Sequence, residues 1–123
     1  MKKVLVVEDN SDNREVCVTV LRHYGYEVVE AVNGEGGLAK AREEKPDIIL
    51  MDLSLPVMDG WEVTRKLKSD PELNGIPVIA ITAHAMSGDE AKALDAGCNG
   101  YLSKPCVPKD IIEAVKKFIG ESG

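Results

Sequence analysis

Five side chains able to do chemistry stand at the ends of apolar runs. Glu8 closes "KVLVVE" and Asp9 follows it, Asp52 closes "DIILMD", Thr82 closes "PVIAIT", and Lys104 follows "GYLS". Such runs are typical of buried strands, and in an open parallel sheet ligands bind beyond the carboxyl ends of the strands. We therefore expect three acids, a hydroxyl and a lysine to meet at one edge of a sheet.

The three carboxylates of Glu8, Asp9 and Asp52 would repel one another, which raises the pKa of at least one unless a cation neutralises them. An oxygen-rich site with room for water suits Mg²⁺, with Asp9 and Asp52 as direct ligands and Glu8 acting through water. An acidic, solvated rim is the alternative. Lys104 would place a positive charge opposite the acids, whether in a functional site or in a simple ion pair.

Carboxylates also act as nucleophiles towards phosphoryl groups and then form an aspartyl phosphate. Such transfer needs positioning and charge neutralisation more than acid–base chemistry. Mg²⁺ and Lys104 would share the charge of the phosphoryl oxygens, and the Thr82 hydroxyl and the Ala83 amide would donate hydrogen bonds. Asp52 ends the central run and is the best-placed acceptor.

The elements that must position these groups alternate regularly along the chain. Strands are predicted over residues 3–8, 26–31, 47–52, 77–82 and 100–103, and helices over residues 10–24, 33–44, 60–68, 87–96 and 108–119. In the first helix Val16, Val20 and Tyr24 form an apolar stripe, with Cys17 and Leu21 beside it. Repeated strand–helix alternation predicts an α/β fold with a right-handed, doubly wound parallel sheet.

Composition limits the classes of function. The 123 residues fit one domain, and the net charge of −6 disfavours a nucleic-acid or anionic membrane surface. The three cysteines form no metal-binding or disulfide pattern, although their role stays open. No apolar run is long enough to cross a bilayer or to act as a signal peptide, so we expect a cytoplasmic protein.

Four segments together resemble a known family, the receiver domain of two-component response regulators. They are "VVEDN" at 6–10, "ILMDLSLPVMDG" at 49–60, "AITAHA" at 80–85 and "YLSKP" at 101–105, in the family's order and spacing. The resemblance covers nearly the whole chain, residues 1–123. It implies a (βα)5 flavodoxin-like three-layer sandwich with a parallel five-stranded sheet in the order 2-1-3-4-5.

The resemblance also implies roles for single residues. It makes Asp52 the phosphoacceptor and Glu8 and Asp9 the acidic pair that binds the metal, with the backbone carbonyl of Ser54 as a further ligand. The Ala83 amide would donate to the phosphoryl group, and Lys104 matches the family's lysine at this site. Thr82 would be the switch hydroxyl and Tyr101 the switch aromatic. Ser54 and His84 occupy the two variable positions that tune the lifetime of the aspartyl phosphate. The Lys104-Pro105 bond is a candidate cis peptide. Glu8 departs from the more common aspartate.

The function implied is a phosphorylation-dependent switch that acts through protein–protein contact. A sensor histidine kinase or a histidine phosphotransfer protein would be the donor, approaching along the rim of the first helix. Val18 and Leu21 are candidate contacts there, although Leu21 is better suited to the core. Small phosphodonors are a further source. A downstream protein would bind the face formed by residues 87–119. Only self-phosphorylation and slow autodephosphorylation are expected as catalysis. Free-standing regulator and hybrid-kinase receiver both stay open.

Two rivals come from other classes. A haloacid-dehalogenase-like phosphatase would carry a second aspartate two residues after its nucleophile, where this chain has Ser54. An FMN carrier of the flavodoxin type would need a Ser/Thr/Gly-rich phosphate loop after the first strand. That segment is the acidic "EDNSDN" here, which would repel a phosphate that lacks a metal.

Overall fold

The computed structural model of the protein describes residues 2–52, 60–82, 97–103 and 107–120. Its strands are β1 (Lys3–Val7), β2 (Glu27–Ala31), β3 (Ile48–Asp52), β4 (Val78–Thr82) and β5 (Gly100–Ser103), and its helices are α1 (Ser11–His23), α2 (Gly34–Glu44), α3 (Gly60–Ser69) and α5 (Pro108–Ile119). The strands match the predicted ranges to within one residue at each end. The helix predicted over 87–96 lies outside the described residues.

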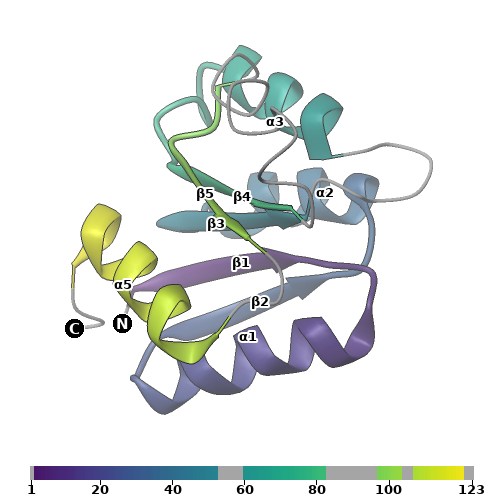
Figure 1. Cartoon of the computed structure of the whole chain (residues 1–123). Helices are drawn as coiled ribbons and strands as arrows, with labels where there is room; N and C mark the ends of the chain where they lie inside the picture. Colours follow the sequence, from purple (N-terminus) through teal and green to yellow (C-terminus); the bar gives the residue numbers. More distant parts are fainter. Residues whose placement is uncertain (1, 53–59, 83–96, 104–106, 121–123) are drawn as a thin grey trace.

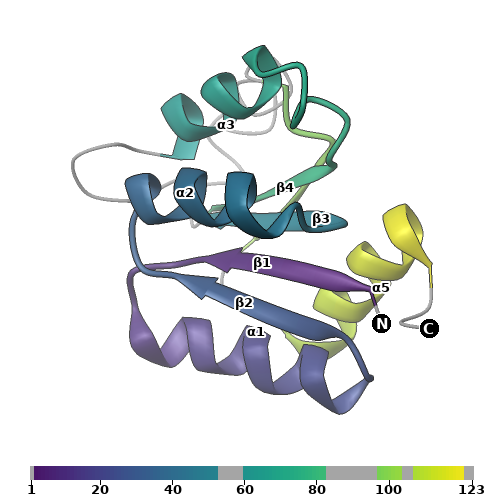
Figure 2. The same ribbon diagram turned by 180° about the vertical axis from the view of Figure 1, so that it is seen from behind.

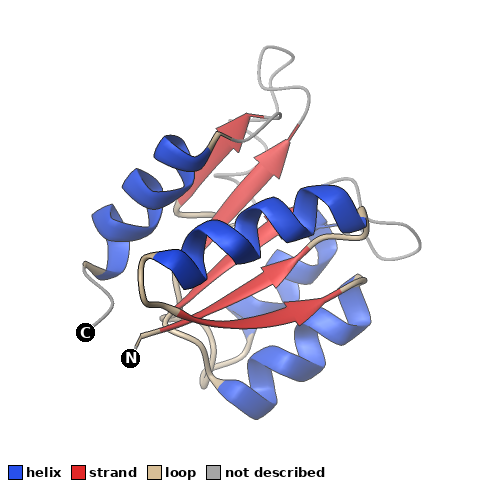
Figure 3. Cartoon of the chain, turned by 90° about the horizontal axis from the view of Figure 1, so that it is seen from below, coloured by secondary structure: helices blue, strands red, loops and turns tan. Residues whose placement is uncertain are grey.

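The strands form one sheet in the order β2-β1-β3-β4-β5, and all neighbouring pairs are parallel. Helices α1 and α5 cover one face of this sheet, whereas α2 and α3 cover the other (Figures 1 and 2). The strand arrows all run towards the same edge (Figure 3). These features confirm the predicted doubly wound, three-layer α/β fold.

The core is divided by the sheet, because successive side chains of a strand point to opposite faces. Leu5, Ile49 and Met51 pack with the apolar residues of α2 and α3. Val6 and Leu50 pack on the other side against α1 and α5. The central strands are therefore apolar on both faces, which explains why their sequences are continuous rather than alternating apolar runs.

Only part of the apolar surface predicted for the first helix is core. Cys17 and Leu21 are buried against the sheet and α5, but Val16 is 43% exposed and Tyr24 49% exposed. Positions 16, 20 and 24 lie beside positions 17 and 21 on the helix, so a period of 3.6 residues fits both stripes. Which stripe faces inward depends on how the helix lies on the sheet, and the sequence alone does not determine this.

The cysteines that the structure describes are core residues. Cys17 and Cys98 are both buried, and burial raises the pKa of the Cys98 thiol, which lowers its thiolate fraction. Cys106 lies outside the described residues. No helix in the described ranges combines the length and apolarity that crossing a bilayer requires.

A single lysine connects α3 to the start of the last two strands. The Lys68 ammonium donates hydrogen bonds to the Ile76 carbonyl at 2.8 Å, to the Asn74 carbonyl at 3.3 Å and to Asn99 Oδ1 at 3.0 Å. Its stem lies against Gly97, whose φ of 103° is in the left-handed region. A Cβ added at Gly97 would stand 2.7 Å from Lys68 Cγ. Both the backbone angle and the space therefore require glycine there.

We expect Gly97→Ala to lower the free energy of unfolding by about 1–2 kcal/mol, because alanine is strained at this backbone angle and displaces the Lys68 stem. Urea unfolding followed by circular dichroism measures the change. Gly75→Ala is the matched control, since nothing lies within 4 Å of a Cβ there. Equal unfolding midpoints for the two variants would contradict this explanation.

Candidate functional site

The carboxyl ends of the strands bring Glu8, Asp9, Asp52 and the backbone of Thr82 to one edge of the sheet. Val7, the last residue of β1, pairs with Met51, so Glu8 and Asp9 follow at the level of Asp52, the last residue of β3. Thr82 ends β4 and pairs with Ser103, the last residue of β5. The sheet register therefore places the ends of four strands side by side, as the order of the strands requires.

Glu8, Asp9 and Asp52 form a cluster in which one carboxylate oxygen from each residue lies within 4.8 Å of the others. Asp52 is fully buried and Glu8 is 2% exposed, whereas Asp9 is open to solvent. Burying carboxylates costs free energy unless hydrogen bonds or a cation compensate. The cluster thus has one open side, formed by Asp9, and two carboxylates held inside the protein.

The backbone around Glu8 is held by its neighbours. The Glu8 amide donates to the Ala31 carbonyl at 3.1 Å and continues the pairing of β1 with β2. Arg14 donates from Nη1 to the Glu8 carbonyl at 2.9 Å and pairs through Nε with Glu30 Oε1 at 3.2 Å. Asn10 caps α1 by accepting from the Asn13 amide at 2.9 Å. The turn that carries the two acids is therefore fixed at both ends.

Arg14 is the residue that sequence reasoning missed. A basic residue in the first turns of a helix is usually a solvated side chain. However, helical side chains point back towards the N-terminus, and here that direction leads to the end of β1. An arginine one turn inside a helix that directly follows an acidic strand end is the signal that was available.

The donor set of this cluster fits a hard divalent cation. Three carboxylates from two adjacent strand ends supply oxygen ligands, and the exposed Asp9 leaves space for water, which Mg²⁺ usually retains. A cation at this position would also offset the cost of the two buried charges. The residues present are therefore compatible with Mg²⁺.

The remaining predicted site residues lie outside the described part of the chain. They are Ser54, Ala83, His84, Lys104 and the Lys104-Pro105 peptide. The backbone of Thr82 is described as the end of β4, but its side chain is not. Tyr101 lies in β5 and packs, partly buried, against the core cluster beneath α2 and α3.

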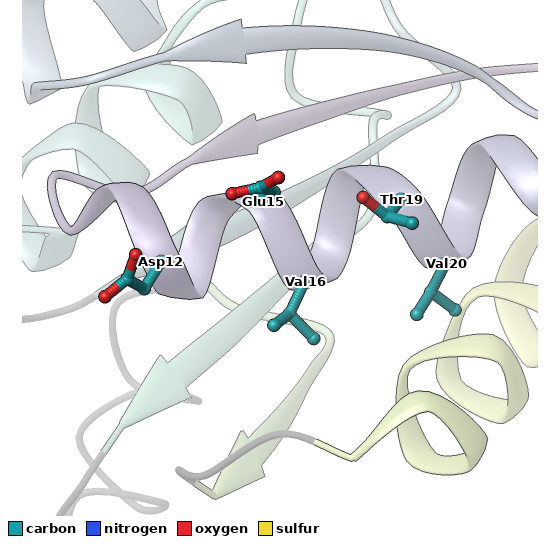
Figure 4. Close-up of a pocket in the computed structure, with 5 residues that line it drawn as sticks. All are labelled: Asp12, Glu15, Val16, Thr19 and Val20. Atoms are coloured by element: carbon teal, nitrogen blue, oxygen red, sulfur yellow. The ribbon is translucent and has the colours of Figure 1, made fainter.

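Beside this edge, α1 carries an apolar groove with a cavity volume of about 460 Å³. It is lined by Asp12, Glu15, Val16, Thr19 and Val20, and Val16 and Val20 project from the same side of the helix (Figure 4). The predicted contact Val18 does not line it, and Leu21 is a core residue, as expected. Val18 is 5% exposed and Leu21 is fully buried, so both belong to the core rather than to the rim.

The chain is similar to known proteins over nearly its whole length. The response regulator receiver domain model matches residues 4–116. The chain is 46% identical over 121 residues to the polar-differentiation response regulator DivK of Brucella anthropi, covering 98% of each chain. It is 45% identical to the DivK protein of Brucella abortus, with the same coverage.

Solved structures resemble this one in fold. The receiver domain of the sensor histidine kinase PA1611 from Pseudomonas aeruginosa, solved with a magnesium ion coordinated in its active-site cleft, has a TM-score of 0.90 and 37% identity over 98% of each chain. The chemotaxis protein CheY4 of Vibrio cholerae has a TM-score of 0.91 and 29% identity, covering 96% of this chain and 98% of CheY4.

Proposed function

Because the chain belongs to the response regulator receiver domain family of two-component signalling, we propose that Asp52 accepts a phosphoryl group and that residues 1–123 act as one switch domain. The donor we propose is the phosphohistidine of a sensor histidine kinase or of a histidine phosphotransfer protein. Small phosphodonors such as acetyl phosphate are a second source. Self-phosphorylation and slow autodephosphorylation are the only catalysis that we assign to the chain.

The observation that supports this proposal is the carboxylate cluster. Asp52 is buried at the end of the central strand, with oxygens of Glu8 and Asp9 within 4.8 Å. In the transfer, a carboxylate oxygen of Asp52 bonds to phosphorus while the phosphorus–nitrogen bond of the donor breaks. The electron pair of that bond stays on the imidazole nitrogen. The product is an acyl phosphate on Asp52.

Neutralising charge is the main requirement of this reaction. We propose that Glu8, Asp9, Asp52 and the backbone carbonyl of Ser54 hold Mg²⁺, which when bound supplies positive charge to the phosphoryl oxygens. Lys104 adds a second positive charge, and the Thr82 hydroxyl and Ala83 amide donate hydrogen bonds. These last roles derive from the family resemblance.

The signal is proposed to be a shift between two populations. Thr82 moves to the phosphoryl group, and Tyr101 turns inward into the space that Thr82 leaves. The downstream protein then binds the face of residues 87–119, of which the structure describes β5 and α5. Ser54 and His84 are proposed to tune how long the phosphoryl group remains.

The direct test is intact-mass measurement after incubation with acetyl phosphate and Mg²⁺. We expect a mass increase of a single phosphoryl group, and none when a chelator removes the metal. An unmodified protein under both conditions would overturn the proposal. Turnover of a phosphomonoester would instead favour the phosphatase alternative.

The α1 groove is the surface that we propose for the histidine donor, because it adjoins the edge where Asp52 lies. Val16→Glu places a charge in the apolar groove, so we expect phosphotransfer from a phosphorylated histidine phosphotransfer domain to slow by about tenfold or more. Labelling by acetyl phosphate, which needs no docking, should be unchanged.

Val32→Glu is the matched control for this variant. Val32 is 53% exposed, comparable to Val16, and lies after β2 rather than on α1. The rate of phosphotransfer to the Val32→Glu variant should stay within about twofold of the rate for the unmodified protein, since surface changes outside an interface have small effects. Equal slowing of both variants would show that the added negative charge alone, and not the groove, controls transfer.

A further inference from the structure

A second concave surface lies between α2 and α3, on the face of the sheet opposite α1. The two helices run side by side in both Figure 1 and Figure 2. The hollow between them has a cavity volume of about 450 Å³ and is lined by Arg42, Arg65, Lys66, Ser69 and Asp70. We refer to these five residues as the α2–α3 hollow.

The charge of this hollow is opposite to that of the protein as a whole. Three cations face one anion there, while the chain carries a net charge of −6. Arg42 Nε lies 3.8 Å from Asp70 Oδ2, a weak pair whose arginine side chain stays 59% exposed. Arg65 and Lys66 are also exposed. Positive charge therefore remains available to a partner.

Helix ends explain only part of this arrangement. Arg42 and Lys66 lie in the last turns of α2 and α3, where cations stabilise the helix carbonyls. That effect accounts for a cation on each helix. It does not account for Arg65, nor for the meeting of all three cations around one hollow. Ser69 contributes little to recognition, since its hydroxyl already donates to the Arg65 carbonyl at 2.8 Å.

We propose that the α2–α3 hollow docks a carboxylate-rich segment of a protein partner. Guanidinium groups pair with carboxylates through two parallel hydrogen bonds, and two arginines line this surface. Its cations are all exposed, which suits a protein segment lying across the surface better than a small ligand enclosed in a pocket. The hollow is a small positive area on a chain of net charge −6, so a short acidic segment fits it, whereas nucleic acid or an anionic membrane would extend over the rest of the acidic chain.

Because the hollow lies away from the edge that carries Asp52, we expect docking there to be independent of phosphorylation. Helices α2 and α3 begin near the edge at which β1 ends (Figure 2). Arg42 and Lys66 lie in the last turns of these helices, and Asp70 directly follows α3. The hollow also lies on the opposite face from α1 and α5. An acidic partner would therefore bind at the same time as a histidine donor.

The test measures binding of a fluorescein-labelled oligoglutamate peptide by anisotropy. We expect binding that weakens as salt is added, and that is the same with or without beryllofluoride bound at Asp52. The affinity of the variant Arg65→Glu/Lys66→Glu for the peptide should fall by about tenfold or more, because attraction is replaced by repulsion. Far-UV circular dichroism confirms that it folds.

Lys109→Glu/Lys117→Glu is the matched control, because it changes net charge equally on the exposed surface of α5. It should bind the peptide within about twofold of the unmodified protein. Equal weakening by both double variants, or no peptide binding at all, would overturn the proposal. Binding of inorganic tripolyphosphate through Arg65 and Lys66 without binding of the peptide would also overturn it, in favour of a phosphate site.

Discussion

Asp52→Asn is expected to abolish phosphorylation, the largest effect of any single substitution considered for this protein. Asparagine has nearly the shape of aspartate, so it fits the fully buried position at the end of β3. Its amide, however, is not a nucleophile towards phosphorus and cannot form an acyl phosphate. Removal of a buried negative charge beside Glu8 and Asp9 should also leave the fold intact, because repulsion within the cluster falls.

Intact-mass measurement after incubation with acetyl phosphate and Mg²⁺ gives a clear reading. The unmodified protein gains a single phosphoryl group, and the Asn variant gains none. Asp110→Asn is the matched control, the same chemical change at an exposed carboxylate on α5, and it should label normally. Labelling of the Asp52→Asn variant to the same extent would assign the acceptor to another residue.

Most of the fold could be predicted because local and long-range preferences agree. Residues 48–51 are apolar on both faces, which is what a central parallel strand needs. Asn33 precedes α2 and accepts a hydrogen bond from the Gly36 amide, as a helix cap should. The orientation of α1 could not be predicted, because two neighbouring stripes satisfy the helical period and packing on the sheet selects between them.

The candidate site also has a part that the sequence predicts and a part that it does not. That Glu8 and Asp52 meet follows from the rule that parallel strands end at one edge, so residue order was sufficient. The contribution of Arg14 depends on a side chain reaching back across a turn to the Glu8 carbonyl, and spacing in the sequence does not encode that contact. Which residues of α1 are exposed also depends on helix orientation, so the sequence suggests Val18 as a donor contact, whereas the structure buries Val18 and places Val16 in the groove.

Mg²⁺ should stabilise the folded protein strongly, because only the folded chain brings the three carboxylates together. A ligand present at about 100 times its dissociation constant adds about 2.7 kcal/mol to the free energy of unfolding. We expect an effect of this size in urea unfolding curves recorded with Mg²⁺ and with a chelator. Asp9→Asn should lose most of it, since Asp9 supplies the open side of the cluster.

Asp9→Asn separates metal binding from folding. Asp9 is exposed, so its replacement buries no new group, and in the presence of chelator the variant should be at least as stable as the unmodified protein. Asp12→Asn, an exposed acid of α1 outside the cluster, should keep the full response to Mg²⁺. Stabilisation that survives in Asp9→Asn, or disappears in Asp12→Asn, would place the cation elsewhere on the acidic surface.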